Sequence, residues 1–342
     1  MTTKSNKHDT LSVAILGYGY WGPNLVRNLI NVGANVKYVV DLDPKRLSIA
    51  QSLYPKINTT TNVDDVFNDH TVDAVVVALP VSLHYEMAKK ALVSGKHVLV
   101  EKPMTDSVDT SAELIDLALK KQKVLMCDHT FIYTGAVKKI HQLVQDKHLG
   151  NLQYFDSVRI NLGLFQSDIN VIWDLAPHDI SVLGHIYDAK PCGVSATGYS
   201  HTNNNIEDIA YLTLFYQSEF IAHISVSWIS PVKVRRLLIG GEQKMVVYDD
   251  VEPTEKVKIY DSSYKIASYE EQNKLKIDYR TGDIFTPKLD TTEALHCVAL
   301  DFINAIVNNT VPISTAELGY NVVKVLQASE QSIKQNGRFV SL

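Results

Sequence analysis

A glycine-rich segment near the start of the sequence has the spacing of a phosphate-binding loop. Gly17, Gly19 and Gly22 form a GxGxxG motif that follows a short apolar run ending at Leu16. Glycines let the backbone approach a pyrophosphate, and the helix N-terminus that follows stabilises its charge. Asp41 ends the second β-branched run, where a carboxylate can accept hydrogen bonds from both ribose hydroxyls. The context predicts a dinucleotide site; the alternative is a glycine turn that only packs a helix against a strand.

The carboxylate of Asp41 also bears on which dinucleotide this loop accepts. A negative charge at this place repels a 2′-phosphate and therefore favours NAD over NADP. Lys45 and Arg46 follow closely and could compensate a phosphate. We predict NAD as the cofactor, with NADP less favoured.

A second group, Asp174-Leu175-Ala176-Pro177-His178, has the spacing of a carboxylate beside an imidazole. Positions i and i+4 of a helix share a face, so Asp174 can lie near His178. We expect this segment to start a helix, where Pro177 is tolerated because first-turn amides lack partners within the helix. The helix N-terminus would keep His178 neutral and able to accept a proton. The alternative is an ordinary N-cap at Asp174 and a packed surface histidine at 178.

The elements that position these groups alternate between strand and helix in the first half of the chain. Apolar runs predict strands at residues 11–16, 36–40, 72–79, 97–100 and 124–127. Helical stretches lie at residues 20–33, from 44 onward, at 83–94 and at 108–121. The run at 72–79 is nearly all Val and Ala, which is typical of a strand buried on both faces. This order predicts a doubly wound parallel sheet with right-handed crossovers.

The pattern changes near residue 150. Strands are predicted at residues 152–162, 209–217, 220–229, 232–239 and 244–249, separated by short turn signals. They indicate an antiparallel meander. Helical period is found at residues 133–147, 292–308 and 315–335. We therefore predict a frayed tail at 1–10, a nucleotide-binding domain at 11–128 and a second domain at 129–342.

A long segment of the first domain, AVVVALPVSLHYEMAKKALVSGKHVLVEKP (residues 74–103), resembles the hallmark of the Gfo/Idh/MocA oxidoreductases. In that family a strand leads to a proline near the cofactor, a helix opens with histidine, and GKHVLVEKP ends the fifth strand. Pro80, His84 and the Glu-Lys-Pro at 101–103 occupy these places. The DxxxH at 174–178 matches the family's second motif. The resemblance covers nearly the whole chain.

The resemblance implies a fold, a cofactor and a set of site residues. The fold is a Rossmann domain followed by an α/β domain with a large, open, mostly antiparallel sheet, whose C-terminal helices pack back on the first domain. The cofactor is a nicotinamide dinucleotide, and the catalytic residues are Lys102 and His178, with Asp174 in support. The implied cofactor contacts are Gly17, Gly19, Tyr20, Trp21, Gly22, Asp41, Leu79, Pro80, His84, Glu101 and Lys102.

These residue types suit the oxidation of a carbinol. His178 can act as general base because an unperturbed imidazole titrates near working pH. Lys102 can hydrogen-bond the substrate oxygen and offset the negative charge that develops on it. The alternative gives the base role to Lys102 and an orienting role to His178.

Four further residues are candidate substrate contacts. His129 and Tyr133 follow the last parallel strand, where this fold places residues near nicotinamide, and Arg159 and Asn161 alternate along one strand. The alternative for Arg159 and Asn161 is a pair of solvent-facing polar side chains on a half-buried strand. Trp228 is most simply a sheet residue.

Composition argues against several other classes of protein. The chain of 342 residues is 45% apolar and 21% charged, with a formal charge of −5, as in an ordinary globular protein, and no basic patch indicates nucleic acid. The three cysteines lie too far apart for a zinc site or a disulfide framework, so we predict no metal and a reducing compartment. The longest apolar run is too short for a membrane helix, and the first ten residues lack the apolar core of a secretory signal. We expect a cytoplasmic protein.

The late strands indicate self-association. They carry apolar residues at both odd and even positions, among them Ile221, Ile224 and Ile229. In a sheet solvated on one face, apolar and polar residues should alternate along each strand. An open apolar face of this size usually marks an interface. We predict a homodimer or a homotetramer formed through the second-domain sheet.

Three segments, GYWGPNLVRN, DHTFIYTGAV and WDLAPHDIS, resemble the branch of the family found with surface-polysaccharide and sugar-nucleotide pathways. That branch implies NAD-dependent oxidation at C3 of a UDP-linked N-acetylhexosamine or its uronate. The alternatives are an inositol dehydrogenase, a free-sugar dehydrogenase or a ketosugar reductase of the same family. A more distant alternative is a non-catalytic nucleotide sensor, which predicts damage to Lys102 or to the DxxxH, and both are intact.

Overall fold

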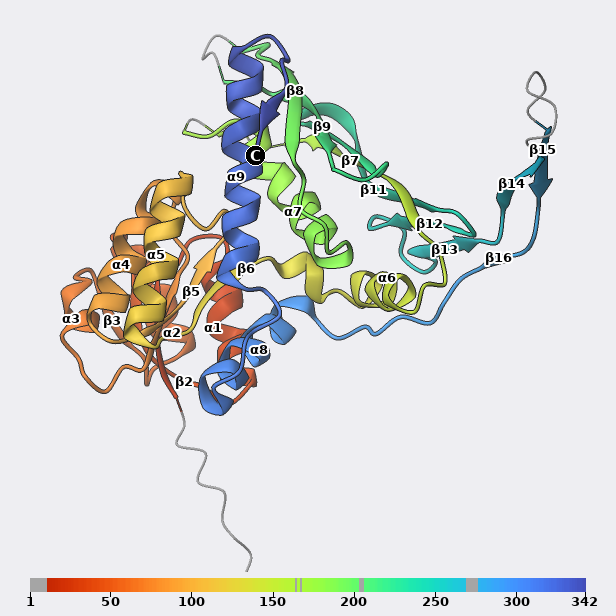
Figure 1. The fold of residues 1–342 in the computed structure, drawn as a ribbon. Helices are drawn as coiled ribbons and strands as arrows, with labels where there is room; N and C mark the ends of the chain where they lie inside the picture. The colour runs from red at the N-terminus through yellow and green to blue at the C-terminus, as the bar shows by residue number, and fades with distance from the viewer. Residues whose placement is uncertain (1–10, 164, 167, 203–205, 269–275) are drawn as a thin grey trace, which may run out of the picture. The chain divides into compact units, whose positions relative to one another are not determined.

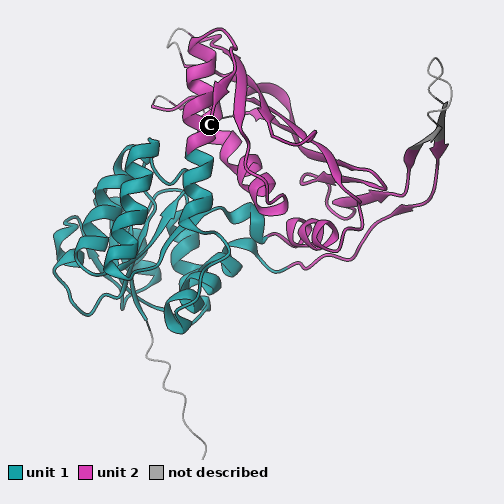
Figure 2. Ribbon diagram, viewed as in Figure 1, with its two compact units in different colours: residues 1–133, 292–323 teal, residues 134–291, 324–342 magenta. Residues whose placement is uncertain are grey.

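The computed structural model describes residues 11–163, 165–166, 168–202, 206–268 and 276–342. The predicted tail, residues 1–10, lies outside the described residues. The chain divides into two compact units, coloured separately in Figure 2. Unit 1 comprises residues 1–133 and 292–323, and unit 2 comprises residues 134–291 and 324–342.

Unit 1 is built on a six-stranded parallel sheet in the order β3-β2-β1-β4-β5-β6. Helices lie beside this sheet in Figure 1. Its elements are β1 (Ser12–Leu16), α1 (Gly22–Asn31), β2 (Asn35–Val40), α2 (Pro44–Leu53), β3 (Asn58–Thr60), α3 (Asp64–Phe67), β4 (Ala74–Val77), η1 (Val81–Leu83), α4 (His84–Val93), β5 (His97–Glu101), α5 (Val108–Lys121), β6 (Leu125–Asp128), η2 (Thr130–Tyr133) and α8 (Ala294–Asn308). Every residue of β4 and β6 is buried, as expected of strands covered on both faces. The predicted doubly wound parallel sheet is confirmed.

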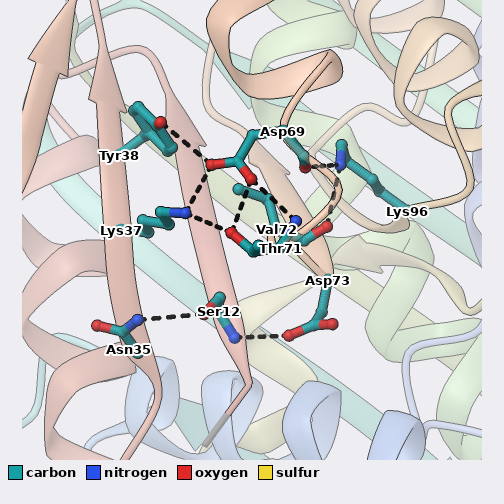
Figure 3. Close-up of polar contacts among 9 residues, drawn as sticks. All are labelled: Ser12, Asn35, Lys37, Tyr38, Asp69, Thr71, Val72, Asp73 and Lys96. Atoms are coloured by element: carbon teal, nitrogen blue, oxygen red, sulfur yellow. Dashed lines mark hydrogen bonds and ion pairs between the residues drawn. The ribbon is translucent and has the colours of Figure 1, made fainter.

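The amino edge of this sheet is held by a network of polar side chains (Figure 3). Lys96 is only 1% exposed, and its ammonium donates hydrogen bonds to the carbonyl oxygens of Asp69 and Val72 at 2.7 and 3.0 Å. The Asp69 carboxylate accepts hydrogen bonds from Lys37 at 2.6 Å and from the Tyr38 hydroxyl at 3.1 Å. The bond from Lys37, more than the others, holds the pKa of the Asp69 carboxyl well below its ordinary range. The lysine of the GKH motif therefore supports the fold.

The C-terminal part of the chain returns to unit 1. Helix α8 packs against α1, where Glu293 forms an ion pair with Arg27 at 2.7 Å. The Tyr133 hydroxyl donates to Asp301 on α8 at 2.6 Å. The two units therefore divide after Tyr133, a few residues beyond the expected boundary, and residues 292–323 complete the nucleotide-binding unit.

Unit 2 is built on a nine-stranded mixed sheet in the order β16-β13-β12-β11-β7-β10-β9-β8-β17. Its elements are α6 (Gly135–Gln145), β7 (Leu152–Leu162), α7 (Val171–Ile186), β8 (Gly193–Tyr199), β9 (Ile209–Phe215), β10 (Ile221–Ser227), β11 (Ile229–Gly241), β12 (Met245–Asp249), β13 (Val257–Tyr260), β14 (Ser263–Ser268), β15 (Lys276–Arg280), β16 (Ile284–Phe285) and β17 (Val340–Ser341). Strands β14 and β15 form a separate antiparallel pair. Helix α9 (Ala316–Lys334) begins in unit 1 and ends in unit 2.

The mostly antiparallel sheet is confirmed, but the predicted simple meander is interrupted. Strand β7 lies between β10 and β11, antiparallel to β11 and parallel to β10. The Ser-Pro at 230–231 does not turn the chain into a hairpin; it lies inside β11, where the register with β7 shifts between Ile229 and Val234. Proline cannot donate to a ladder and therefore marks this irregularity. A local pattern of alternation predicts strands but not their order in the sheet.

Burial alternates at successive residues along β9 and most of β10. Helix α7 packs against β7, β9 and β10 on one face of the sheet. The residues of the opposite face are less buried, and several are apolar: Tyr154, Ile160, Ile209, Tyr211, Phe215, Ile221 and Val234. Both faces of this part of the sheet thus carry apolar side chains.

Three features are absent from the described ranges. No helix there is long and apolar enough to cross a bilayer. No group of three or more His, Cys, Asp or Glu side chains is arranged there to hold a metal ion, and the three cysteines form no disulfide.

Candidate functional site

The glycine loop lies at the point where the strand order of the unit 1 sheet reverses, between β1 and β4. Gly17 has a φ of +99°, and a Cβ there would lie 2.2 Å from the carbonyl oxygen of Ala78. A Cβ on Gly22 would lie 2.4 Å from the Gly17 carbonyl oxygen, so only glycine fits at both places. A Cβ on Gly19 would meet only the Arg46 side chain, at 3.7 Å. The middle of the loop is therefore open to a phosphate.

Asp41 follows β2 and is buried beside this loop. Its Oδ2 accepts the Tyr18 amide at 2.7 Å, and its Oδ1 accepts the Asp43 amide at 2.8 Å. The Arg46 Nη1 lies 3.4 Å from Oδ2. A carboxylate oxygen has two lone-pair sites, so Oδ1 can still accept a ribose hydroxyl, whereas Oδ2 already has two donors. The loop and Asp41 together fit a dinucleotide, while Arg46 brings a cation to the same place.

The other predicted cofactor residues lie around the same switch point. Tyr20 and Trp21 precede α1 with exposed rings in edge-to-face contact, their centroids 5.1 Å apart. Leu79 and Pro80 follow β4. None of these four residues is buried, so a cofactor can contact them without rearrangement of the core.

His84 begins α4 and is buried. Its ring nitrogens lie 2.8 Å from the Pro103 carbonyl oxygen and 2.7 Å from the Leu79 carbonyl oxygen. Burial, as the largest effect, lowers the pKa of His84, while the two carbonyl partners oppose this shift. His84 therefore ties the segment after β4 to the segment after β5, which carries Lys102.

The ends of β5 and β6 bring four ionisable side chains together. Glu101 and Asp128 are register partners on these adjacent parallel strands, and Lys102 and His129 follow them in the chain. Glu101 is 9% exposed and Asp128 is 1% exposed. The Lys102 amide donates to Glu101 Oε2 at 3.1 Å. Burial raises the pKa values of both carboxyls, and the positive charge of Lys102 opposes this rise.

His129 is enclosed at this edge of the sheet. Burial lowers its pKa to about 3, assisted by the charge of Lys102, so the imidazole is neutral. Among the described residues, neither ring nitrogen of His129 has a hydrogen-bond partner, and neither does Asp128 Oδ2. Sequence reasoning missed Asp128, although aligning the ends of the two strands would have placed it beside Glu101.

Tyr133 lies close by in η2 and is buried. Its hydroxyl donates to Asp301 at 2.6 Å and accepts the Ser314 amide at 3.0 Å. Both hydrogen bonds are within unit 1, where they attach η2 to α8 and to the segment that follows it.

Helix α7 carries the DxxxH motif, but it begins earlier than expected. Its first residue is Val171, and the side chain of Asn170 caps it by accepting two first-turn amides at 3.1 and 3.2 Å. The expectations of a helix start, or of an N-cap, at Asp174 are therefore wrong. Pro177 lies inside the helix, where it removes a backbone hydrogen bond. His178 lies beyond the first turn, so the helix terminus has little effect on its charge.

Asp174 and His178 share the less buried face of α7, whereas most of the other side chains of this helix are buried. The indole Nε1 of Trp228, a buried residue between β10 and β11, donates to Asp174 Oδ2 at 2.9 Å. Trp228 was expected to be only a sheet residue. Its hydrogen bond fixes the carboxylate that accompanies His178, and no sequence signal links the two positions.

Arg159 lies on the face of β7 that α7 covers. Its Nε and Nη2 bind the two carboxylate oxygens of Asp179 at 2.9 and 2.8 Å, and both side chains are buried. A bidentate pair of this kind orients both partners. The expected alternative of a solvent-facing Arg159 is therefore wrong. Asn161 is half-buried two residues further along the strand.

The predicted site residues thus form two groups. The cofactor loop, Lys102, His129 and Tyr133 belong to unit 1, and Asp174, His178, Arg159 and Asn161 belong to unit 2. Two family models match the chain in the same division. The oxidoreductase family model with an NAD-binding Rossmann fold matches residues 11–129, and the C-terminal domain model of the same family matches residues 137–247. The chain belongs to the Gfo/Idh/MocA oxidoreductase family. It is an enzyme, and its first unit is an NAD-binding Rossmann domain.

Relatives within the Gfo/Idh/MocA family act on different substrates. The scyllo-inositol 2-dehydrogenase (NADP⁺) IolW of Bacillus subtilis is 24% identical, over 96% of this chain and 95% of its own length. The UDP-N-acetylglucosamine 3-dehydrogenase of Acidithiobacillus ferrooxidans is 28% identical, over 52% of this chain and 56% of its own length. Both relatives are dehydrogenases.

Solved structures of the family share the fold. The structure of GnnA, the UDP-N-acetylglucosamine 3-dehydrogenase of A. ferrooxidans, superposes with a TM-score of 0.81 at 20% identity, covering 96% of this chain and 99% of that one. GenD2 from gentamicin A biosynthesis, solved in complex with NAD, also has a TM-score of 0.81, at 22% identity, covering 97% of this chain and 96% of its own.

Proposed function

We propose that this oxidoreductase oxidises the C3 hydroxyl of a UDP-linked N-acetylhexosamine or of its uronate, in surface-polysaccharide biosynthesis in the cytoplasm, with NAD preferred over NADP. The observation that carries the substrate class is the 28% identity to the UDP-N-acetylglucosamine 3-dehydrogenase of A. ferrooxidans. The three segments quoted above for this branch support it. The preference for NAD rests on the buried carboxylate of Asp41.

In this proposal Lys102 and His178 act on the same hydroxyl. Bound NAD supplies the hydride acceptor, and the protein must remove the hydroxyl proton and stabilise the alkoxide. His178 takes the proton as general base, because imidazole is a good acceptor at neutral pH. Lys102 donates a hydrogen bond to the same oxygen. Asp174, fixed by Trp228, orients the imidazole or binds a neighbouring hydroxyl.

In an alternative assignment Lys102 is the general base that takes the hydroxyl proton. It is supported by the two buried carboxyls beside Lys102, which make proton exchange at this place possible. His178 then orients the substrate. The two assignments differ in which variant, Lys102→Ala or His178→Ala, retains activity when the pH is raised.

Of the four candidate substrate residues, His129 and Asn161 are proposed to contact the substrate, and Tyr133 and Arg159 to act through the groups they hold. His129 is the strongest candidate of unit 1, because its neutral ring has two nitrogens without partners among the described residues. Tyr133 acts through the segment its hydroxyl anchors. Arg159 holds Asp179, the residue after His178, and so steadies this part of α7. Asn161 offers an amide on the same strand.

A second candidate function is the oxidation of an inositol or a free sugar, or the reduction of a ketosugar. It is favoured by the match to IolW, which extends over nearly the full length of both chains. A non-catalytic nucleotide sensor is a third candidate, but the intact Lys102, Asp174 and His178 argue against it.

A substrate panel tests the proposed function. UDP-N-acetylglucosamine, its uronate, free N-acetylglucosamine, myo-inositol and scyllo-inositol are each incubated with the enzyme and NAD, and NADH is followed by absorbance. We expect turnover with a nucleotide sugar and thermal stabilisation that follows ligand concentration. Turnover of inositol or a free sugar alone would replace the proposal by the second candidate.

We also propose that the enzyme is a homodimer or homotetramer formed through the open face of the unit 2 sheet. Tyr211, Phe215 and Ile221 leave apolar area on this face of neighbouring strands, and such area is usually covered by a partner. Light scattering at micromolar concentration measures the mass. A stable particle with the mass of one chain contradicts the proposal.

A further inference from the structure

We propose that Asp128 is a positioning residue of this reaction: with Glu101 it forms a buried carboxyl pair that holds one proton and one negative charge beside Lys102. The proposal rests on the proposed role of Lys102 in carbinol oxidation. It concerns a residue that the sequence analysis did not identify.

The sheet brings the two carboxyls together. Glu101 and Asp128 are paired across β5 and β6, whose neighbouring strands lie about 4.8 Å apart in a sheet. Paired residues of parallel strands point to the same face, so the two side chains share one environment. Asp128 Oδ1 accepts the Thr130 hydroxyl at 2.7 Å, and Oδ2 has no hydrogen-bond partner among the described residues. One oxygen of the pair is thus anchored and another is left for a proton.

Charge repulsion decides how many protons the pair holds. Two carboxylates this close and this buried cannot both ionise readily, and one of them keeps its proton. Burial raises the pKa of each, and for Glu101 the neighbouring Asp128 adds to the rise. The charge of Lys102 opposes the rise for both, so the pair does not keep two protons. One proton and one negative charge remain at neutral pH.

Apart from Lys102, three ionisable groups near the pair stay uncharged at neutral pH. Burial raises the pKa of the Cys127 thiol, which precedes Asp128 on β6. Burial lowers the pKa of His129 to about 3. The pKa of Tyr133 is raised by burial and by its hydrogen bond to Asp301 on α8. The carboxyl pair, rather than these three groups, therefore changes charge near neutrality.

A single negative charge suits the proposed role of Lys102. With no carboxylate beside it, the half-buried ammonium of Lys102 would lack a compensating charge. With two, the ammonium would be held by the carboxylates rather than donate to the substrate oxygen. The pair keeps the intermediate state, with one negative charge beside the ammonium of Lys102.

Infrared spectroscopy of the purified full chain, without cofactor, tests the pair directly. The carbonyl band of a protonated carboxyl is followed against pH and assigned with Glu101→Gln. We expect this band at pH 7 in the wild type, and a fall of about one pH unit or more in its midpoint in Asp128→Asn, because a neighbouring negative charge is removed. Lys102→Met should raise the midpoint by a similar amount, which provides a second test if Asp128→Asn does not fold. Asp73→Asn, the same change at the exposed amino edge, is the matched control.

Absence of the band at pH 7 in the wild type, or an unchanged midpoint in both variants, overturns the proposal. The pH profile of kcat with the substrate found in the panel is the second measurement. Asp128→Asn should change the shape of this profile, whereas a merely structural role would scale it without changing its shape. Because the infrared titration needs no substrate, failure of the panel and failure of this proposal are distinguishable.

Discussion

Two lysines of the same motif, Lys96 and Lys102, flank β5 and lie in opposite electrostatic settings. Lys96 precedes the strand, is buried, and donates to two backbone carbonyls at the amino edge of the sheet (Figure 3). Lys102 follows the strand at the carboxyl edge, beside Glu101, Asp128 and a neutral imidazole. One edge has its buried polar groups satisfied, and the other has several that are not.

The contrast between the two edges of the sheet separates a structural region from a candidate reactive one. A buried charge with complete hydrogen bonds stabilises the fold and has no capacity left for a ligand. Buried groups with missing partners and shifted pKa values cost stability and are retained where they serve a reaction. The amino edge should therefore respond to mutation in stability, and the carboxyl edge in activity.

The largest expected effect is on catalysis. A positioned acid or base contributes about 10²- to 10⁴-fold, so Lys102→Ala and His178→Ala should each lower kcat by at least about 100-fold. Affinity for NAD should change little, and Asp174→Ala should cost less. Steady-state kinetics and NAD titration measure both quantities. Near-wild-type kcat in either of the first two variants would remove that residue from the mechanism.

The amino edge is broken by Lys96→Met, which keeps the volume of the side chain but removes its donors. Two carbonyl oxygens lose their partner, at about 1–3 kcal/mol for a buried group. We expect the free energy of unfolding in urea to fall by about 2 kcal/mol or more, with kcat of the folded enzyme unchanged. Lys121→Met, at an exposed position, should stay within about 0.5 kcal/mol of wild type. Lost activity with unchanged stability in Lys96→Met would contradict the expectation that the amino edge acts through stability.

A smaller effect is expected for cofactor choice. Asp41→Ala removes the charge that repels a 2′-phosphate but leaves Arg46 in place. The ratio of kcat/KM with NAD to that with NADP should fall by about tenfold or more, without loss of activity. Arg46→Ala should move the ratio in the opposite direction. An unchanged ratio in both variants would place the discrimination elsewhere.

The smallest effect concerns acid stability. The pKa of the Asp69 carboxyl is depressed, so its contribution is fully present above the unfolded value and is lost as the pH falls through the folded one. With an ordinary carboxyl value near 4, the loss begins below about pH 5. Asp69→Asn should lower stability by at most about 1 kcal/mol at pH 7 and less at pH 3. A loss of stability in Asp69→Asn that becomes larger as the pH falls would contradict this prediction.

Much of the fold could be predicted from the sequence because its signals are local. The parallel sheet of unit 1 was predicted from the apolar run before Gly17, the β-branched strands and the glycines that end helices. In unit 2 the strands were found but not their order, since the insertion of β7 between β10 and β11 depends on long-range pairing. The start of α7 was predicted too late, because both Asn170 and Asp174 are residues that favour an N-cap, and it is Asn170, directly before an apolar run, that caps the helix.

The candidate site was predictable where a motif names its residues and unpredictable where tertiary structure supplies the partner. The glycine loop, Asp41 and Lys102 follow from spacing and family resemblance. Trp228 bonds Asp174 across 54 positions of sequence, and Asp128 meets Glu101 only through strand register. Such partners are hidden until the sheet is known, because no local pattern distinguishes them from ordinary core or cap residues.

The return of residues 292–323 to unit 1 has a consequence for synthesis on the ribosome. Glu293 and Asp301, which bond Arg27 and Tyr133, are translated only after most of unit 2. The nucleotide-binding unit, although it begins the chain, is therefore completed after most of its neighbour has been made. A nascent fragment ending near residue 133 would leave the α8-covered side of α1 exposed, so a chaperone has its longest opportunity to bind there.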